Sequence, residues 1–213
     1  MPTPVLSRLC LVLAGLASSA ACAATVYDNG APDRSWGTQM SEFQVADDFQ
    51  LAAGQDISSI TFWSLQASAA DYSGQLTWGI YSDAGGSPGS LLQGSTLSLA
   101  GVATGQSSGF GYQEYRFDIG VSFSLAAGHY WLALHNGPAG LTTPTDMLWG
   151  TSGSAGAGGV YHDGSGWWGS GNEQAFLLGG SPTPAVPEPA SGLLFAAGLA
   201  AVGGLRRRAT LRT

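Results

Sequence analysis

The sequence contains no lysine, and all seven of its basic residues are arginine. Only 10% of the 213 residues are charged, whereas about 25% is usual for a soluble protein. Nucleic-acid binding needs a cluster of basic side chains, so the formal net charge of -7 argues against that class of function. The 33 glycines disfavour a helix-rich domain, because glycine weakens helix interiors. The 44% hydrophobic content argues against disorder.

Cysteine occurs only twice, at Cys10 and Cys22, and both positions lie in the N-terminal segment 1–24. If that segment is removed during export, the mature chain has no disulfide, no thiol nucleophile and no thiolate metal site. The domain must then fold by core burial alone. Cys22 also raises the alternative of a lipoprotein signal, although Ser19 stands three positions before it, where such signals usually carry leucine.

Residues 1–24 have the composition of a secretory signal peptide. Arg8 supplies a positive charge before the apolar run Leu9–Leu16, and small residues follow, so cleavage is predicted after Ala23 or Ala24. The alternative, a membrane-spanning helix, is disfavoured because the apolar run is too short for a bilayer core of about 30 Å.

Three features follow one another near the C-terminus: Val186–Pro189 reads V-P-E-P, Ser191–Leu205 is an uncharged stretch, and Arg206, Arg207 and Arg208 come next. As a helix the stretch would span about 23 Å, less than the bilayer core of about 30 Å. It therefore predicts a short transmembrane helix that holds the chain temporarily. The arginines predict a cytoplasmic end by the positive-inside rule, with the domain outside.

This order of motif, apolar stretch and arginine cluster resembles the PEP-CTERM sorting signal of Gram-negative bacteria. The resemblance covers residues 185–208. It implies that Pro187, Glu188 and Pro189 are the tripeptide recognised by an exosortase, a membrane-embedded enzyme similar to cysteine transpeptidases. It further implies transient residence in the inner membrane, export to the cell surface or matrix, and association with extracellular polysaccharide. The alternative is a plain C-terminal anchor behind a proline-rich linker.

The sequence between the two end segments is interpreted as one domain at 25–180 and a linker at 181–185, before the sorting signal at 186–208. The domain contains 13 acidic residues and two arginines, so its formal charge is near -11. Such a domain repels polyanions and tolerates divalent cations.

Apolar and polar residues alternate with period two in many short segments of this domain, as in half-buried strands. In one of them, Leu76, Trp78 and Ile80 share a face. Glycine-, serine- and proline-rich turns separate the segments. The pattern predicts an all-β domain, an antiparallel β-sandwich of jelly-roll type. Strands are expected at 43–51, 58–65, 75–81, 91–99, 113–118, 121–125, 129–135, 146–150, 158–162 and 173–178.

Two short segments, Phe49–Gly54 and Phe123–Gly128, are nearly identical. They lie too far apart along the chain to be neighbouring units of a solenoid repeat. Each is predicted to end a strand in the same turn, once per half of the sandwich. Segments such as A-D-D-F-Q-L and L-A-A-G-H-Y-W-L-A-L resemble β-sandwich domains found before PEP-CTERM signals, a resemblance that implies the fold and no agreed activity.

Asp47 is the most informative candidate for chemistry. Alternation along 43–51 places it on the inward face, next to outward Asp48. An unpaired buried carboxylate is costly, so a bulge turns Asp47 outward, the backbone hydrogen-bonds it, or it binds a cation. Calcium suits carboxylate and carbonyl oxygens, with Asp47 and Asp48 as ligands and Asp28 and Asn29 nearby, although the chain has no D-x-D-x-D-G loop.

Trp167 and Trp168 stand in a glycine-rich segment, and indole faces on a loop can stack on sugar rings. The alternative is that one of them plugs the end of the sandwich. His129 and His135 fall on one strand face but about 20 Å apart, too far to share a metal ion. The three histidines, His162 included, are interpreted as surface or strand-edge residues.

Gly105–Gly109 matches G-x-S-x-G, with Asp118 or Asp146 and then His162 in the order of an α/β-hydrolase. That motif needs a strand, a turn and a helix, and no helix pattern follows it here. The sequence therefore predicts an exported structural or adhesive protein of the cell surface or extracellular matrix, without catalytic activity of its own. A carbohydrate-binding module is the second alternative, and a secreted hydrolase is the most remote.

Overall fold

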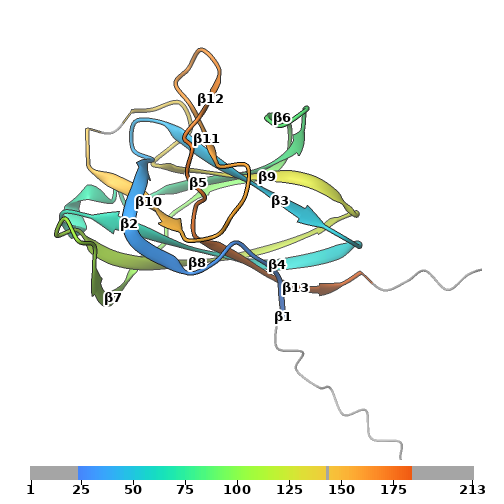
Figure 1. Cartoon of the computed structure of the whole chain (residues 1–213), viewed down its shortest axis with the longest axis horizontal. Coiled ribbons are helices and arrows are strands. Elements are labelled where there is room, and N and C mark those ends of the chain that lie inside the picture. The colour runs from blue at the N-terminus through green and yellow to red at the C-terminus, as the bar shows by residue number, and fades with distance from the viewer. Residues whose placement is uncertain (1–23, 143, 184–213) are drawn as a thin grey trace, which may run out of the picture.

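The computed structural model describes residues 24–142 and 144–183 (Figure 1). These residues form two antiparallel β-sheets packed face to face, which confirms the predicted all-β sandwich. Within these ranges the only helical element is the single-turn 3-10 helix η1 (Ala69–Asp71), and no helix is long and apolar enough to cross a membrane. The predicted signal peptide as far as residue 23 and the predicted helix at 191–205 lie outside the described residues.

Sheet A is built around the long strand β4 (Gln55–Gln66). β8 (Gln113–Leu125) pairs along the whole of one side of β4. β13 (Phe176–Pro182) and β10 (Met147–Ser152) pair with successive parts of its other side. Three outer strands complete the sheet: β7 (Val102–Ser107) beside β8, β1 (Ala24–Asp28) beside β13, and β2 (Pro32–Gln39) beside β10.

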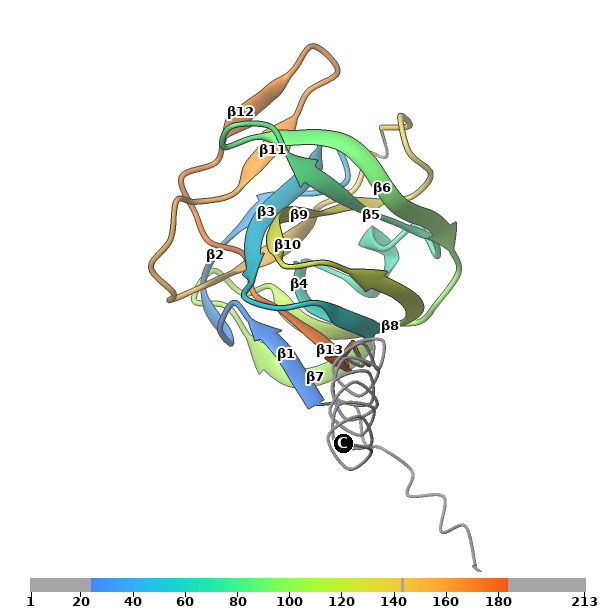
Figure 2. The same cartoon turned by 90° about the vertical axis from the view of Figure 1, so that its right-hand side faces the viewer.

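Sheet B has the strand order β12-β11-β3-β9-β5-β6. Figure 2 shows its central strands above those of sheet A. The chain crosses between the sheets from β3 to β4 and from β8 to β9, as expected for a jelly-roll-like sandwich. The strands of sheet B are β12 (Trp167–Gly169), β11 (Val160–His162), β3 (Gln44–Leu51), β9 (Gly128–Asn136), β5 (Leu76–Asp83) and β6 (Pro88–Leu97).

The core between the sheets is aromatic and aliphatic, because alternating side chains of both sheets point into it. Phe62 and Phe117 stack with ring centroids 4.9 Å apart, and Trp149 contacts Phe176 at 5.9 Å. All four are fully buried, and each contributes about 1.5–3 kcal/mol through burial. The Trp149 indole N–H donates to the Ala175 carbonyl at 2.9 Å, so its polar atom is satisfied.

A second, smaller apolar cluster lies on the outer face of sheet B. Trp131 is buried there among Ala46, Ala133 and Val160, with Trp167 packed against them. Neighbouring residues of β3 and β9 point into the main core instead, as the alternation of a strand requires. Sheet B therefore carries apolar residues on both faces.

The repeated segments occupy equivalent places in the two sheets. Phe49–Gly54 covers the end of β3 and the turn before β4, and Phe123–Gly128 covers the end of β8 and the turn into β9. β3 pairs with β9, and β4 pairs with β8. The prediction of two strand ends is confirmed, whereas the turns differ, because three residues separate β3 from β4 and two separate β8 from β9.

Four strands of the structure, β1, β2, β7 and β12, are missing from the predicted set. β2 has a turn-like sequence, with Pro32, Gly37 and Arg34 at φ 60°, and it lies at a sheet edge, where proline is tolerated. Nearly every position of β7 is exposed, so it has no inward face. Period-two alternation cannot reveal strands that bury no continuous face.

Several predicted boundaries also differ from the structure, two of them with a clear physical reason. The sequence predicts separate strands at 113–118 and 121–125, where β8 is continuous, because a register shift in the pairing with β4 absorbs the irregularity around Gly120. β13 runs to Pro182, so Ser181 and Pro182 of the predicted 181–185 linker belong to a strand, in register with Asp56 and Gln55.

Candidate functional site

Asp47 lies on β3 with its side chain fully buried, on the inward face that alternation predicts. Its Oδ2 accepts hydrogen bonds from the backbone N–H of Gln174 at 2.5 Å and from Asn29 Nδ2 at 3.1 Å. Its Oδ1 accepts from the N–H of Asp48 at 2.9 Å. The pairing of β3 with β9 has no register shift, so the bulge alternative is wrong, and backbone hydrogen bonds satisfy the carboxylate.

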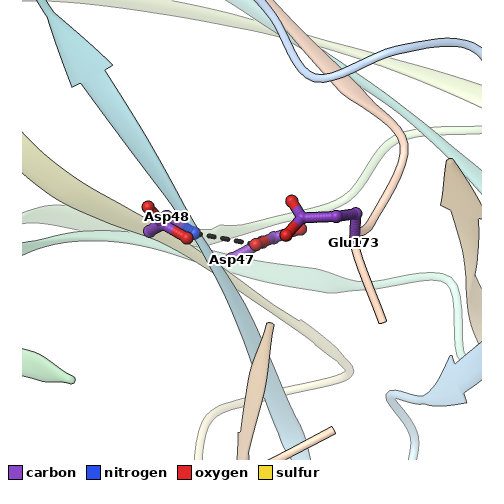
Figure 3. A group of neighbouring side chains, drawn as sticks. All are labelled: Asp47, Asp48 and Glu173. Carbon is purple, nitrogen blue, oxygen red and sulfur yellow. Dashed lines mark hydrogen bonds between the residues drawn. The ribbon is translucent and has the colours of Figure 1, made fainter. Parts of the chain in front are cut away.

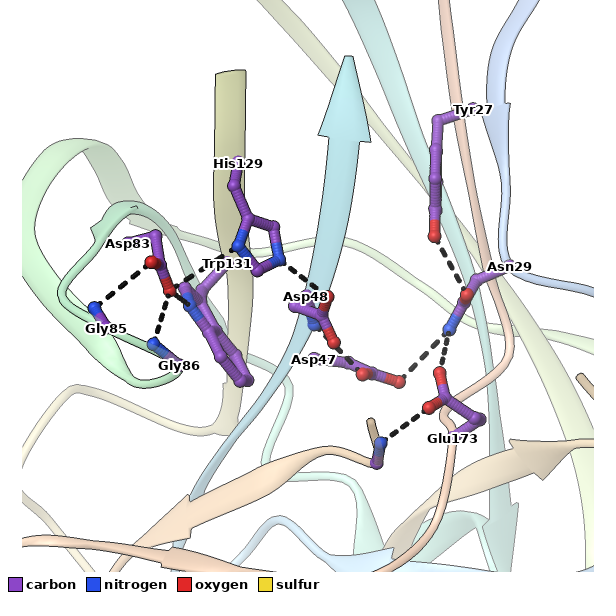
Figure 4. A network of polar contacts seen from close by, with 11 residues as sticks. Tyr27, Asn29, Asp47, Asp48, Asp83, Gly85, Gly86, His129, Trp131 and Glu173 are labelled. Atoms are coloured by element: carbon purple, nitrogen blue, oxygen red, sulfur yellow. Dashed lines mark hydrogen bonds and ion pairs between the residues drawn. The ribbon is translucent and has the colours of Figure 1, made fainter. Parts of the chain in front are cut away.

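Asn29, in the turn between β1 and β2, joins Asp47 to Glu173 (Figure 4). Its Nδ2 lies 3.2 Å from Glu173 Oε2 and 2.9 Å from the Gln174 carbonyl oxygen. An amide has two hydrogens, so one of them is shared between acceptors. Tyr27 donates its hydroxyl to Asn29 Oδ1 at 3.0 Å, which fixes the orientation of the amide. The predicted proximity of Asn29 to Asp47 is confirmed.

Glu173 fastens a loop to this network. The N–H of Gly158 donates to Glu173 Oε1 at 2.6 Å. A Cβ at Gly156 would lie 2.2 Å from the same oxygen, so the carboxylate fits only against glycine there. The network therefore ties the β1–β2 turn, β3, the loop before β11 and the segment that enters β13 to one another.

Asp48 points to the outer face of sheet B and belongs to a different set of contacts (Figure 4). Its Oδ2 lies 2.6 Å from His129 Nε2. On the other side of the ring, Nδ1 lies 3.6 Å from Asp83 Oδ1, and Asp83 also accepts a hydrogen bond from Trp131 Nε1 at 2.9 Å. This outer chain of contacts places an imidazole between two carboxylates.

Asp47, Asp48 and Glu173 each offer one carboxylate oxygen, and these oxygens all lie within 4.8 Å of one another (Figure 3). Among the described residues, these three form the group of acidic side chains that is close enough together to hold a metal ion. Calcium takes six to eight oxygen ligands, and both oxygens of Asp47 already accept N–H groups. Calcium at Asp47 and Asp48 therefore stays a prediction, with Glu173 added to the candidate ligands, and Asp28 lies outside the set.

Burial raises the pKa of Asp47 from 3.8 to about 8, and the charges of Glu173 and Asp48 add to this effect. Hydrogen bonds from the Gln174 and Asp48 N–H groups oppose it. Between about pH 4 and pH 8 the folded protein therefore keeps the proton on Asp47, whereas the unfolded chain releases it. Stability linked to this proton is complete below the unfolded pKa and is lost as the pH rises from about 4 to about 8.

We expect the melting temperature of the protein to fall across that pH window, which circular dichroism at a series of pH values would measure. Glu173→Gln should make the decrease smaller, because it removes a negative charge that raises the pKa of Asp47. A melting temperature that rises with pH through the same window would contradict this account.

The two tryptophans proposed for sugar stacking lie on the hairpin of β11 and β12. Trp167 packs on the outer face of sheet B, with ring centroids 5.0 Å from His162 and 6.0 Å from Tyr81. Trp168 is 53% exposed. The alternative that one of them plugs the end of the sandwich is wrong, because one covers a sheet face and the other is open to solvent.

The remaining sequence candidates are separated by the fold. His135 is buried, and burial lowers its pKa, so its interpretation as a surface or strand-edge residue is wrong. The G-x-S-x-G match at 105–109 spans the end of β7 and a turn in which the Ser108 N–H donates to the Tyr112 carbonyl. As expected, no helix follows it among the described residues.

A groove that sequence analysis did not find lies between the β2 edge of sheet A and the β11–β12 edge of sheet B. Its volume is about 660 Å³, within the range of about 300–1,000 Å³ typical of ligand pockets. Aromatic and aliphatic side chains dominate its lining, and a few polar groups stand among them. The apolar set is Trp36, Phe43, Phe110, Leu148 and Tyr161, and the polar side chains are Thr38, Gln39, Tyr112, Asp146, Ser170 and Asn172.

Asp146 is held at the groove by two neighbours. Gln39 Nε2 donates to Asp146 Oδ1 at 3.1 Å, and the Tyr112 hydroxyl donates to Oδ2. The hydrogen bond to Asp146 also raises the pKa of Tyr112. The carboxylate is thereby fixed in place, and each of its oxygens has a second lone pair that can accept a further donor.

The exposed aromatic residues of the groove had a recognisable signal in the sequence. Trp36 stands in a turn-like stretch beside Gly37, and Phe110 stands between Gly109 and Gly111. Such segments are too glycine-rich to be plain core strands, the same signal that pointed to Trp167 and Trp168. Their convergence could not be read from sequence, because strands β3 to β7 separate the two stretches along the chain.

Comparison with known proteins identifies one part of the chain. The family model of the PEP-CTERM protein-sorting motif matches residues 185–208, and no curated protein matches the chain. The β-sandwich is thus followed by the sorting motif of an exported protein, one that is processed by an exosortase at the cell envelope or surface. The predicted motif residues Pro187, Glu188 and Pro189 and the cluster Arg206–Arg208 fall inside the match and outside the described structure.

Proposed function

We propose that this protein is a structural and adhesive component of the cell surface or extracellular matrix that holds carbohydrate without cleaving it. The groove between β2 and β12 is the observation that carries the proposal. The PEP-CTERM motif accounts for export, and the sandwich supplies the part that makes contact outside the cell. The polysaccharide associated with such proteins would be the binding partner.

The exposed aromatic rings support binding to sugars. Trp36 is 59% exposed and Phe110 is 41% exposed. Their ring centroids lie 5.9 Å apart with planes tilted by 60°, so they do not cover each other's faces. An aromatic face provides a large apolar surface for the C–H side of a sugar ring, and the amides of Gln39 and Asn172 stand beside it to meet hydroxyl groups.

The position of the groove relative to the sorting motif also supports an adhesive role. Asn172 lines the groove and lies just before β13. β13 has seven residues and ends at Pro182, so it spans about 23 Å. Figure 1 shows β2 and β10 on the left of the sandwich and the arrowhead of β13 toward the right. The groove therefore lies toward the end of β13 opposite to Pro182, the last residue of the sandwich strand that precedes the sorting motif in the sequence.

The single carboxylate of the groove favours binding over hydrolysis. Asp146 is the only carboxylate among the described residues that line the groove itself, whereas Glu42 and Asp71 line a hollow beside it. Both oxygens of Asp146 accept hydrogen bonds. A glycosidase of the usual kind needs two carboxyl groups about 5–9 Å apart across its substrate. On this basis we propose that the protein is not an enzyme.

A glycan array probed with the purified protein would test this function. We expect Trp36→Ala to weaken binding to any positive glycan about tenfold, which corresponds to about 1.4 kcal/mol. Trp63→Ala is the matched control, because Trp63 is partly exposed on sheet A outside the groove. Loss of binding in Trp168→Ala but not in Trp36→Ala would move the site to the β12 hairpin, and a blank array would contradict carbohydrate binding.

A further inference from the structure

The aromatic groove continues into two neighbouring hollows. One, of about 520 Å³, shares Gln39 and Asp146 with the groove and adds Glu42 and Asp71. The second hollow, of about 320 Å³, shares Asn172 and is also lined by the carboxylates of Asp33 and Glu173. The three together exceed the size of a typical single-ligand pocket. Their combined volume leaves room for a ligand larger than a single sugar unit.

All charged side chains that line these three hollows are acidic. Among the described residues, no arginine or histidine lines any of them. Arg34, the nearest arginine in sequence, is engaged elsewhere, with its Nε 2.8 Å from Glu114 Oε2. The formal charge of residues 25–180 is also strongly negative. A cleft lined by charge of one sign attracts ligands of the opposite sign and repels those of the same sign.

The buried side chain of Gln174 lies next to the groove and contains an oxygen atom that accepts no hydrogen bond from the described residues. Gln174 is fully buried, and its Nε2 donates to Thr38 Oγ1 at 2.9 Å and to the Asn172 carbonyl at 3.1 Å. Both of these residues line the groove. Gln174 Oε1 accepts no hydrogen bond from any described residue. Buried polar atoms are normally satisfied, so this amide keeps an acceptor free next to the groove.

From this combination we infer that the groove takes a cationic glycan, a chain of hexosamine units with free amino groups. The inference rests on the proposed function, and it names the class of sugar. The aromatic faces of Trp36 and Phe110 suit sugar rings, and the carboxylates of Asp146, Glu42 and Asp71 suit ammonium groups. A hexosamine chain carries both features on each unit, whereas uronic-acid polymers are repelled.

Three oligosaccharides of equal length separate the possibilities in calorimetric titrations of the purified protein. They are a glucosamine hexamer with free amines, its fully N-acetylated form and a neutral β-1,4-glucose hexamer, at mildly acidic pH. We expect the free-amine hexamer to bind at least about tenfold more tightly than the other two. This preference should shrink between about 50 mM and about 500 mM salt, because salt screens exposed charges.

Two variants locate the charge effect. Asp146→Asn and Glu42→Gln should each reduce the preference for the free-amine hexamer several-fold, and Glu42→Gln, which lies outside the aromatic groove, should leave binding of the glucose hexamer unchanged. Glu42 is exposed, so its variant stays informative if Asp146→Asn disturbs the fold. Asp118→Asn is the control, because it makes the same change in charge on sheet A, outside the three hollows.

The outcomes distinguish this inference from the function on which it rests. Equal, Trp36-dependent binding of all three hexamers would overturn the preference for amino sugars and leave the carbohydrate groove standing. Binding of no hexamer would overturn both. Binding of the free-amine hexamer that Trp36→Ala does not weaken, and that a lysine hexapeptide reproduces, would show charge attraction alone and would overturn the inference.

Discussion

Replacing Asp47 with alanine is expected to lower the free energy of unfolding by about 3 kcal/mol or more. The change removes the acceptor of the Gln174 and Asp48 N–H groups and one of the three acceptors of Asn29 Nδ2. A buried donor left without a partner costs about 1–3 kcal/mol. Denaturant titration of the purified protein followed by tryptophan fluorescence would measure the loss.

Asp48→Ala provides the matched control for this result. Asp48 is the next residue of the same strand, but its side chain points outward and contacts His129. Partly exposed ion pairs contribute about 0–1 kcal/mol, so this variant should unfold almost like the parent. Equal stability of the two variants would contradict the role assigned to the buried network.

Glu188→Ala is expected to leave the sandwich folded and to block sorting, so that the chain keeps its tail and stays in the inner membrane. Glu188 carries the only charge between Gln174 and Leu205. Proline on both sides restricts the backbone toward an extended conformation, the form in which an enzyme can bind a peptide segment. Cell fractionation and intact-mass spectrometry of the released protein would measure processing.

Two further variants make the sorting experiment decisive. Glu42→Ala removes the same side chain from an exposed position in the sandwich, and it should be processed normally. Deletion of Arg206–Arg208 should also impair sorting, by weakening the cytoplasmic end of the anchor. If Glu188→Ala is released like the parent, recognition of the tripeptide by exosortase is contradicted, and a plain anchor becomes the better account.

Local periodicity explains which parts of the fold could be predicted. β5 and β9 each bury one face, so their alternating apolar residues identify both strands in the sequence. These residues are Trp78 and Ile80 in β5 and Leu132 and Leu134 in β9. The same alternation placed Asp47 inside the sandwich. β2 follows no such rule, because its backbone passes through a left-handed conformation at Arg34 and its hydrogen bonds to β10 decide its form.

The residues that contact Asp47 could not be predicted, because local periodicity says nothing about which distant segments pack together. Glu173 and Asp47 lie near opposite ends of the domain sequence, and only the packing of the segment before β13 against β3 brings them together. His135 was misplaced because a strand pattern identifies a face but not what covers it. The groove combines residues from both sheets and from the turn near Phe110, and tertiary structure alone determines that convergence.

The place of β13 has a mechanical consequence. Its N-terminal end adjoins the groove and its C-terminal end leads toward the sorting motif, with β1 on one side and β4 on the other. Tension between a polymer held in the groove and an attached tail would run along the axis of this strand. Antiparallel hydrogen bonds lie across the strand direction, so the rungs on both flanks would share the load in shear instead of opening one after another.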